Sequence, residues 1–179
     1  MSSGRRNKLT GQIGEFLVCA ELGVQGMIAT PFAGNVPAFD VLAADEAGRT
    51  VPIQVKSSRS AQWPADASQW LKLRVRNGQQ QKLGLQEISH PALIYVFVAI
   101  RDDRQEGIHD RFFILTKKRL QALIDVGYTH YMEERAWCRP RNPRSFDYRI
   151  TPDQLAEFEN DWALVSQQMN KQEPFTENL

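Results

Sequence analysis

Three polar side chains in the first third of the chain have the types and the spacing of a metal site. Asp40 supplies a carboxylate, and Gln54 and Lys56 follow on either side of Val55. Carboxylate and amide oxygens suit Mg²⁺ or Mn²⁺ better than Zn²⁺, which accepts nitrogen and sulfur more readily. These residues indicate either a hard divalent cation with a lysine beside it or the solvated polar face of an edge hairpin.

A β-hairpin would bring these side chains onto one surface. Asp40 and Gln54 are equally far along the chain from Ala47, so a turn centred there makes them direct cross-strand neighbours. Their Cβ atoms would lie roughly 5 Å apart, and strand alternation places Lys56 on the same face. The spacing therefore predicts that three polar groups converge.

The opposite face of the same hairpin gives a reason for this register. It pairs Phe39 with Val55 and Val41 with Ile53, so that face has an apolar surface to bury. A slip by one residue would place Asp40 among these apolar residues and away from the other polar groups. We therefore expect the register that builds the site.

Glu15 is a further candidate, and its role depends on a helix predicted over residues 9–22. Apolar residues recur there at helical spacing, namely Leu9, Ile13, Phe16, Leu17 and Ala20. Glu15 lies off this stripe, on a second, largely apolar face with Gly11, Val18, Cys19 and Leu22. A carboxylate in such surroundings is unfavourable unless it meets a cation. Glu15 is therefore either a surface residue or, if this face packs near the hairpin, a further metal ligand.

The elements around these residues predict an α/β domain with a mixed central β-sheet flanked by helices. Residues 26–31, 38–44 and 50–57 have β-type composition and are separated by Gly, Asn and Pro, which indicates a three-stranded meander. The continuously apolar residues 93–100 predict a strand covered on both faces. A strand at 112–115 precedes a helix that Thr116 caps and that ends near residue 126.

The remaining segments are assigned from weaker patterns. Residues 70–75 alternate like a half-buried strand, and residues 79–88 are expected to form a short helix. Thr151-Pro152 opens a C-terminal helix over about 152–170, with an apolar stripe that includes Leu155, Phe158, Trp162 and Val165. We expect this stripe to lie in the core or in a dimer interface.

Length and composition favour one domain over residues 1–179. The chain is 42% hydrophobic, enough for a core without disulfides or a structural metal. Its two cysteines are far apart and have no metal-ligand spacing. No apolar run approaches the roughly 20 residues of a membrane span, and the first residues lack the apolar stretch of a signal peptide. We therefore expect a cytoplasmic protein without membrane contact.

A segment over residues 135–149 combines basic and aromatic side chains. Its arginines are Arg135, Arg139, Arg141, Arg144 and Arg149, interleaved with Trp137, Phe146 and Tyr148. This composition suits phosphate contacts and base stacking on nucleic acid. It equally suits a solvated loop with a few structural ion pairs.

Several of these residues together resemble the PD-(D/E)xK nuclease superfamily over roughly the first third of the chain. The resemblance comprises Gly14-Glu15-x-x-Val18 on a leading helix, then Phe39-Asp40, then Ile-Gln-Val-Lys-Ser-Ser at residues 53–58. Asp40 and Lys56 match the superfamily positions directly. Gln54 stands where an acid is usual and Phe39 where proline is usual, so the sequence is similar to the glutamine variants of homing-endonuclease and resolvase-like branches.

The resemblance implies a restriction-endonuclease-like core of αβββαβ order and a Mg²⁺-dependent (or Mn²⁺-dependent) DNA endonuclease. It implies a metal site of Glu15, Asp40, Gln54 and the Val55 carbonyl, with Lys56 beside the attacking water. We place Ser57, Ser58 and Arg59 beside the scissile strand, and the nucleic-acid contacts further include Arg139, Arg141 and Arg144.

Two other functions are compatible with the same residues. A nuclease-like fold that has lost hydrolysis could bind nucleic acid or a protein partner, which the uncharged Gln54 favours. An RNA-cleaving enzyme could use the same site. Cutting both strands of DNA usually takes two sites, which is consistent with a homodimer.

Overall fold

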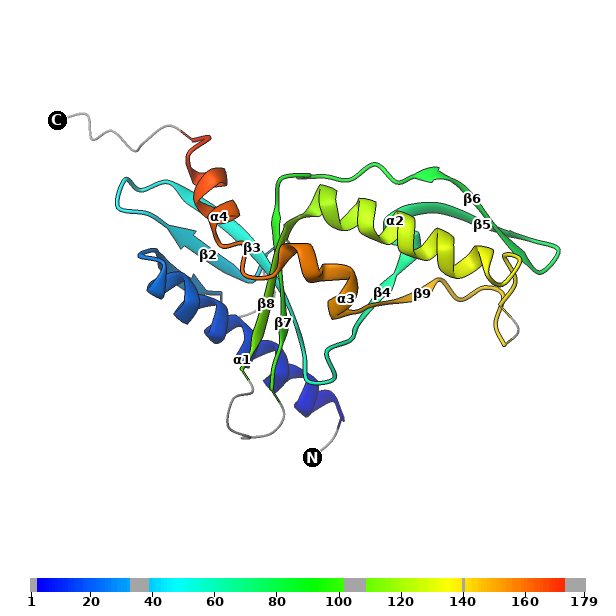
Figure 1. The fold of residues 1–179 in the computed structure, drawn as a ribbon, viewed down its shortest axis with the longest axis horizontal. Helices are drawn as coiled ribbons and strands as arrows, with labels where there is room; N and C mark the ends of the chain where they lie inside the picture. Colours follow the sequence, from blue (N-terminus) through cyan, green and yellow to red (C-terminus); the bar gives the residue numbers. More distant parts are fainter. Residues whose placement is uncertain (1–2, 33–38, 102–108, 140, 173–179) are drawn as a thin grey trace.

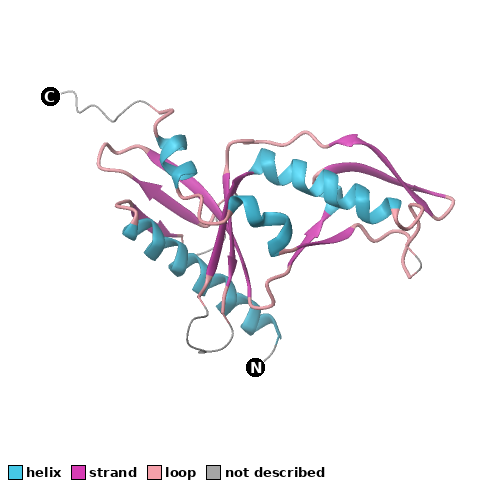
Figure 2. Ribbon diagram, viewed as in Figure 1, coloured by secondary structure: helices cyan, strands magenta, loops and turns pink. Residues whose placement is uncertain are grey.

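A computed structural model of the chain describes residues 3–32, 39–101, 109–139 and 141–172. Its main sheet has the strand order β1-β2-β3-β7-β8. These strands are β1 Ile28–Pro31, β2 Val41–Ala44, β3 Thr50–Ser58, β7 Ile94–Ala99 and β8 Arg111–Thr116. The β3–β7 pair is parallel and the others are antiparallel, so the expected mixed central sheet is confirmed (Figures 1 and 2).

The predicted meander forms β1, β2 and β3, and its register is the expected one. Val41 lies opposite Ile53, and the Asp40 N–H donates to the Ile53 carbonyl at 2.9 Å. The expected pairing of Phe39 with Val55 is wrong, because the ladder ends at Val41. The Phe39 ring instead meets the Phe32 ring edge-on, with centroids 5.2 Å apart.

Helix α1 (Ser3–Val24) covers one face of this meander. It buries Gly14, Val18 and Leu22 against that face of the sheet, whereas Leu9 and Phe16 of the expected stripe are 44% and 55% exposed. The helix is confirmed, and of the expected stripe Ile13 and Leu17 pack against the core. The second apolar face packs closest to β3 because Gly14 lies on it and has no side chain to hold the helix away from that strand.

The expected central strand at residues 93–100 is confirmed as β7, nearly all of whose side chains are buried. Helix α2 (Lys117–Glu133) follows β8, and the Thr116 hydroxyl accepts from the Arg119 N–H at 3.2 Å as the expected cap. The second face of the sheet packs on α2 and on a cluster that includes Trp63 and Trp70. The sheet thus separates two hydrophobic cores.

The segment between β3 and β7 is built of strands. It comprises β4 Trp63–Asp66, the 3₁₀ helix η1 Ala67–Gln69, β5 Leu71–Arg76 and β6 Gln79–Leu85, and β4 pairs with β9 Asp147–Ile150. The helix expected at 79–88 is wrong, and so is the αβββαβ order at this crossover. Asn77 and Gly78 both have positive φ, 52° and 77°, as a tight hairpin turn requires.

The prediction of one continuous C-terminal helix over 152–170 is also wrong. It is divided into α3 Pro152–Leu155, the 3₁₀ helix η2 Ala156–Phe158 and α4 Ala163–Met169. Leu155 packs in the core beside α2, whereas Trp162 and Val165 pack in the core beside α1. Because the helix is broken at Asn160, where φ is 57°, residues of one apolar stripe pack in both cores. No helix among the described residues is long and apolar enough to cross a bilayer.

Candidate metal and catalytic site

Asp40 is held at the point where β2 begins. Its carboxylate oxygen Oδ2 accepts from the Val55 N–H at 2.8 Å and from the Gln54 side-chain amide. The side chain is half-buried. Because main-chain and side-chain donors fix the same oxygen, the carboxylate has one defined position at the open end of the hairpin.

Gln54 occupies the centre of this arrangement. It lies opposite Tyr95 in the parallel β3–β7 pair, and its Nε2 donates to Asp40. An amide carries a donor nitrogen and an acceptor oxygen on the same planar group. Turning this amide by half a revolution would present Oε1 to a cation shared with Asp40, so Gln54 can serve either as a partner of Asp40 or as a metal ligand.

Glu15 reaches the same region from α1. Burial raises the pKa of the Glu15 carboxyl above its ordinary value, and repulsion from Asp40 raises that pKa further. Two carboxylates that repel one another in a half-buried setting are stabilised when a divalent cation lies between them. Glu15 is half-buried and close enough to Asp40 for its pKa to respond to that carboxylate.

A close approach of α1 to β3 sets the position of Glu15. Gly14 is buried, and a Cβ atom added to it would overlap the Ser57 hydroxyl and lie 2.7 Å from the Ser57 Cβ. The Ser57 Oγ is itself buried and has no hydrogen-bond partner within the described part of the chain. Glycine is therefore required next to Glu15 for steric reasons.

Lys56 lies on the same strand face as Gln54 and is exposed. Its ammonium makes no hydrogen bond or ion pair with any described residue. Lys56 lines a pocket of about 370 Å³ together with Asp66, Trp70 and Tyr95. The charge is thus available to a ligand that enters this pocket.

Tyr95 belongs to this region and was not foreseen from the sequence. Burial raises the pKa of its phenol above the usual range, and the charge of Asp40 adds to this effect. The phenol therefore stays protonated and can donate a hydrogen bond. The available signal was that Tyr95 carries the one polar group in the apolar run 93–100, but its place beside Gln54 depends on a parallel pairing that the sequence does not specify.

The donor set fits a hard divalent cation through two carboxylates. Among the described residues, no group of three or more His, Cys, Asp or Glu side chains gathers at one point. Glu15 and Asp40 would therefore need further oxygen donors, for which Gln54 and the Val55 carbonyl are the candidates. Such a set suits Mg²⁺ or Mn²⁺ rather than Zn²⁺.

The residues after Lys56 differ in their surroundings. Ser58 is buried, and its hydroxyl donates to the Gln62 carbonyl at 2.9 Å and accepts from the N–H groups of Ser60 and Gln62. It therefore organises the turn after β3. Ser57 faces α1, and Arg59 is half-buried with interactions of its own.

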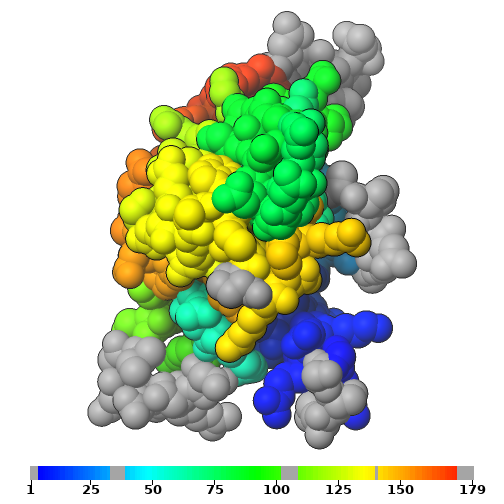
Figure 3. Space-filling model, turned by 90° about the vertical axis from the view of Figure 1, so that its right-hand side faces the viewer, coloured from blue at the N-terminus to red at the C-terminus, as the bar shows by residue number. Residues whose placement is uncertain are grey.

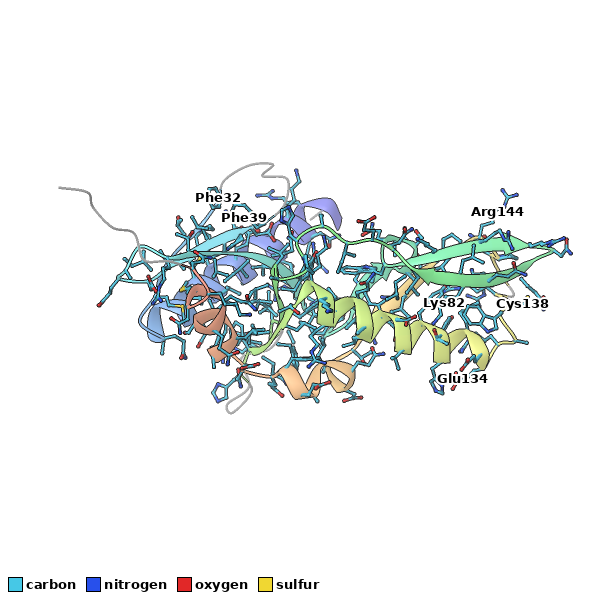
Figure 4. The ribbon with its side chains drawn as sticks, turned by 90° about the horizontal axis from the view of Figure 1, so that it is seen from above. Phe32, Phe39, Lys82, Glu134, Cys138 and Arg144 are labelled. Carbon is cyan, nitrogen blue, oxygen red and sulfur yellow. The ribbon has the colours of Figure 1, made fainter. Side chains whose placement is uncertain are left out.

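The structure does not bring Arg139, Arg141 or Arg144 to Asp40. They follow α2 at the other end of the molecule, where Figure 4 shows Arg144 far from Phe39. The Arg139 guanidinium lies over the Tyr131 ring at 5.0 Å from its centroid and donates to the Asp147 carbonyl. The contacts of Arg139 are thus with other residues of this region, whereas Arg141 and Arg144 are exposed.

Comparison with known proteins shows only distant structural likeness. No protein-family model matches the chain, and no curated protein matches it. Among solved structures, a bacterial homing endonuclease aligns with 92% of this chain and 96% of its own, at 13% sequence identity and a TM-score of 0.46. This likeness is too distant to indicate a function, so the functional interpretation depends on the side chains described above.

Proposed function

We propose that the protein is a Mg²⁺- or Mn²⁺-dependent DNA endonuclease. The observation that supports this most is the convergence of Glu15 and Asp40, from α1 and from the start of β2, together with an unpaired Lys56 two residues after Gln54 on β3. Paired carboxylates next to a free ammonium are what metal-assisted hydrolysis of a phosphodiester needs. The resemblance of Asp40, Gln54 and Lys56 to a PD-(D/E)xK motif agrees with this function.

Each residue has a definite part in the proposed reaction. Glu15 and Asp40 would hold the cation, with Gln54 and the Val55 carbonyl as neutral oxygen donors. When bound, the cation lowers the pKa of a coordinated water and polarises the phosphoryl oxygens. The Lys56 ammonium would orient the attacking water and stabilise the negative charge that develops on the phosphate.

A cleavage assay tests the proposal. Supercoiled plasmid and branched DNA are incubated with the protein in Mg²⁺, in Mn²⁺ or in chelator, in parallel with the Lys56→Ala protein. We expect nicking that requires the metal and that falls at least about 10²-fold in the variant, the scale on which single charge-stabilising groups act. Intact DNA with both proteins and both metals would reject the proposal.

One observation favours a second function, a catalytically silent fold that binds nucleic acid. Gln54 donates its amide to Asp40, so the two side chains already satisfy one another without a metal. For that function, the protein would bind DNA equally well in chelator and would cleave neither DNA nor RNA. Cleavage of RNA but not of DNA would instead indicate the RNA-processing alternative.

A further inference from the structure

The β5–β6 hairpin has two faces of different character. Cross-strand pairs place Leu73 opposite Lys82 and Val75 opposite Gln80 on the inner face. This face is fixed to the rest of the molecule, because Lys82 binds Asp125 of α2 at 2.7 Å. The hairpin is therefore presented as a rigid element and not as a loose loop.

A second set of contacts holds the far part of the hairpin. Gln80 is 2% exposed, and its amide donates to the carbonyls of Pro143 and Ser145, both at 2.8 Å. Its oxygen accepts from the Tyr128 hydroxyl. The loop that carries Arg141 and Arg144 is thereby anchored against β6, and Figure 3 shows the two segments side by side on this end of the molecule.

The outer face of the hairpin is basic and polar except for Leu83, which is 57% exposed. We call this face the ribbon surface, and it consists of Lys72, Arg74, Arg76, Gln79, Gln81 and Leu83. None of these six residues is acidic, and the three basic residues follow one another along β5 at every second position. Arg74 binds the Gln81 amide oxygen at 2.8 Å, a neutral partner that leaves its charge uncompensated.

We propose that the ribbon surface binds duplex DNA, with the hairpin lying in the major groove. Phosphates attract the three cations. The major groove, about 12 Å wide, admits a two-stranded β-ribbon, and arginine and glutamine are the side chains that pair bidentately with guanine and adenine there. The choice of DNA as the partner rests on the proposed function, but the surface itself is separate from the metal site.

The length of the hairpin and its neighbours agree with this partner. Six residues of β5 span about 20 Å, which is enough to follow the groove over several base pairs. The exposed Arg141 and Arg144 lie on the loop anchored to β6, where they can extend the basic surface towards the phosphates on one side of the groove. The arginine-rich segment would thus act together with the hairpin and not beside Lys56.

Binding measurements with matched charge variants test the inference. The variant Lys72→Gln/Arg74→Gln/Arg76→Gln is compared with a control, Lys118→Gln/Arg119→Gln/Lys171→Gln, whose residues are exposed and lie outside the ribbon surface. Each set removes three positive charges, so the two variants have the same formal net charge. All proteins carry Lys56→Ala and are kept in chelator, so that binding is measured without cutting.

We expect the ribbon variant to bind a fluorescent 30-base-pair duplex at least about tenfold more weakly than the control, by anisotropy. The slope of log affinity against log salt should fall by up to about 2.7, or 0.9 for each lost phosphate contact. Methylating guanine N7, which lies in the major groove, should weaken binding by the control but not by the ribbon variant. Unchanged thermal unfolding of both variants would show that the fold is intact.

Three results would overturn the inference. These are equal affinities of the two variants, binding that is indifferent to N7 methylation, and absence of DNA binding by the control. The outcome is independent of the nuclease assay, because a ribbon that binds DNA in a protein that never cleaves it supports this inference and rejects only the proposed function. If a ribbon variant that retains Lys56 cleaved DNA and bound it with undiminished affinity, the result would support the proposed function and reject this inference.

Discussion

At the scale of single residues, the candidate site is a balance of charges. Asp40 is held by two donors at one oxygen, Glu15 approaches it from the helix, and Lys56 is left without a partner among the described residues. Without a cation, the two carboxylates oppose one another. In the proposed function, a divalent cation would offset this repulsion.

Removing the charge of Glu15 should relieve this repulsion. A carboxyl whose folded-state pKa is raised binds its proton more tightly when folded, so its ionisation lowers stability as pH rises from about 4.5 through the folded-state value. In chelator at pH 7, we expect Glu15→Gln to have a higher Tm than the wild type, and the difference should vanish near pH 4. Added Mn²⁺ should raise the Tm of the wild type but not that of the variant. A lower Tm for Glu15→Gln in chelator would contradict this placement.

Gly14 should be required for the approach of α1 to β3. In Gly14→Ala, the new Cβ would meet Ser57, and overpacking of this kind costs about 1–3 kcal/mol. Gly11→Ala is the matched control, because a Cβ there meets nothing within 4 Å and alanine favours a helix by about 0.5–1 kcal/mol over glycine. Urea unfolding should thus show opposite signs for the two variants, and equal effects would exclude the steric explanation.

At the scale of elements, the sequence predicts those segments that have both a clear hydrophobic pattern and clear boundary residues. The register of β2 and β3 follows from the distances of Asp40 and Gln54 to Ala47, and the strand at 93–100 follows from its unbroken apolar run. These elements carry most of the candidate site. The convergence of Asp40 and Gln54 was therefore predictable from local spacing alone.

The predictions from sequence were wrong where packing between segments distant in the chain determines the structure. Residues 79–85 form a strand because Asn77-Gly78 turns the chain and Gln80 is bound by a loop more than 60 residues away. The Asn-Gly signal was present in the sequence and could have predicted the hairpin. The buried face of α1, by contrast, depends on which of two apolar faces meets β3, and periodicity does not distinguish them.

Gln80 should be the main anchor of the β5–β6 hairpin. Gln80→Leu would leave the carbonyls of Pro143 and Ser145 without their donor inside the protein, at a cost of about 1–3 kcal/mol. Gln81→Leu, on the outer face, should change stability by less than about 0.5 kcal/mol. Denaturant unfolding measures both, and a Gln80→Leu protein as stable as Gln81→Leu would show that the loop is held in another way.

At the scale of the whole molecule, the β5–β6 hairpin lies apart from α1 and the β2–β3 hairpin (Figure 1). Helix α1, β2 and Phe39 lie towards one end, and the β5–β6 hairpin and Arg144 lie at the other (Figures 1 and 4). Helix α2 and the β4–β9 pair join the two ends. Under the two proposals, the ribbon surface would position the duplex and the site on α1, β2 and β3 would hydrolyse it.

The central claim is that Glu15, Asp40 and Gln54 bind a divalent cation beside Lys56, and calorimetric titration with Mn²⁺ tests it most directly. The account predicts one site in the wild type, none in Asp40→Ala, and tighter binding in Gln54→Glu, because a third carboxylate replaces a neutral amide. Lys56→Ala should keep the site. Equal Mn²⁺ affinity in the wild type and Asp40→Ala, or no binding by any of the four proteins, would contradict the account.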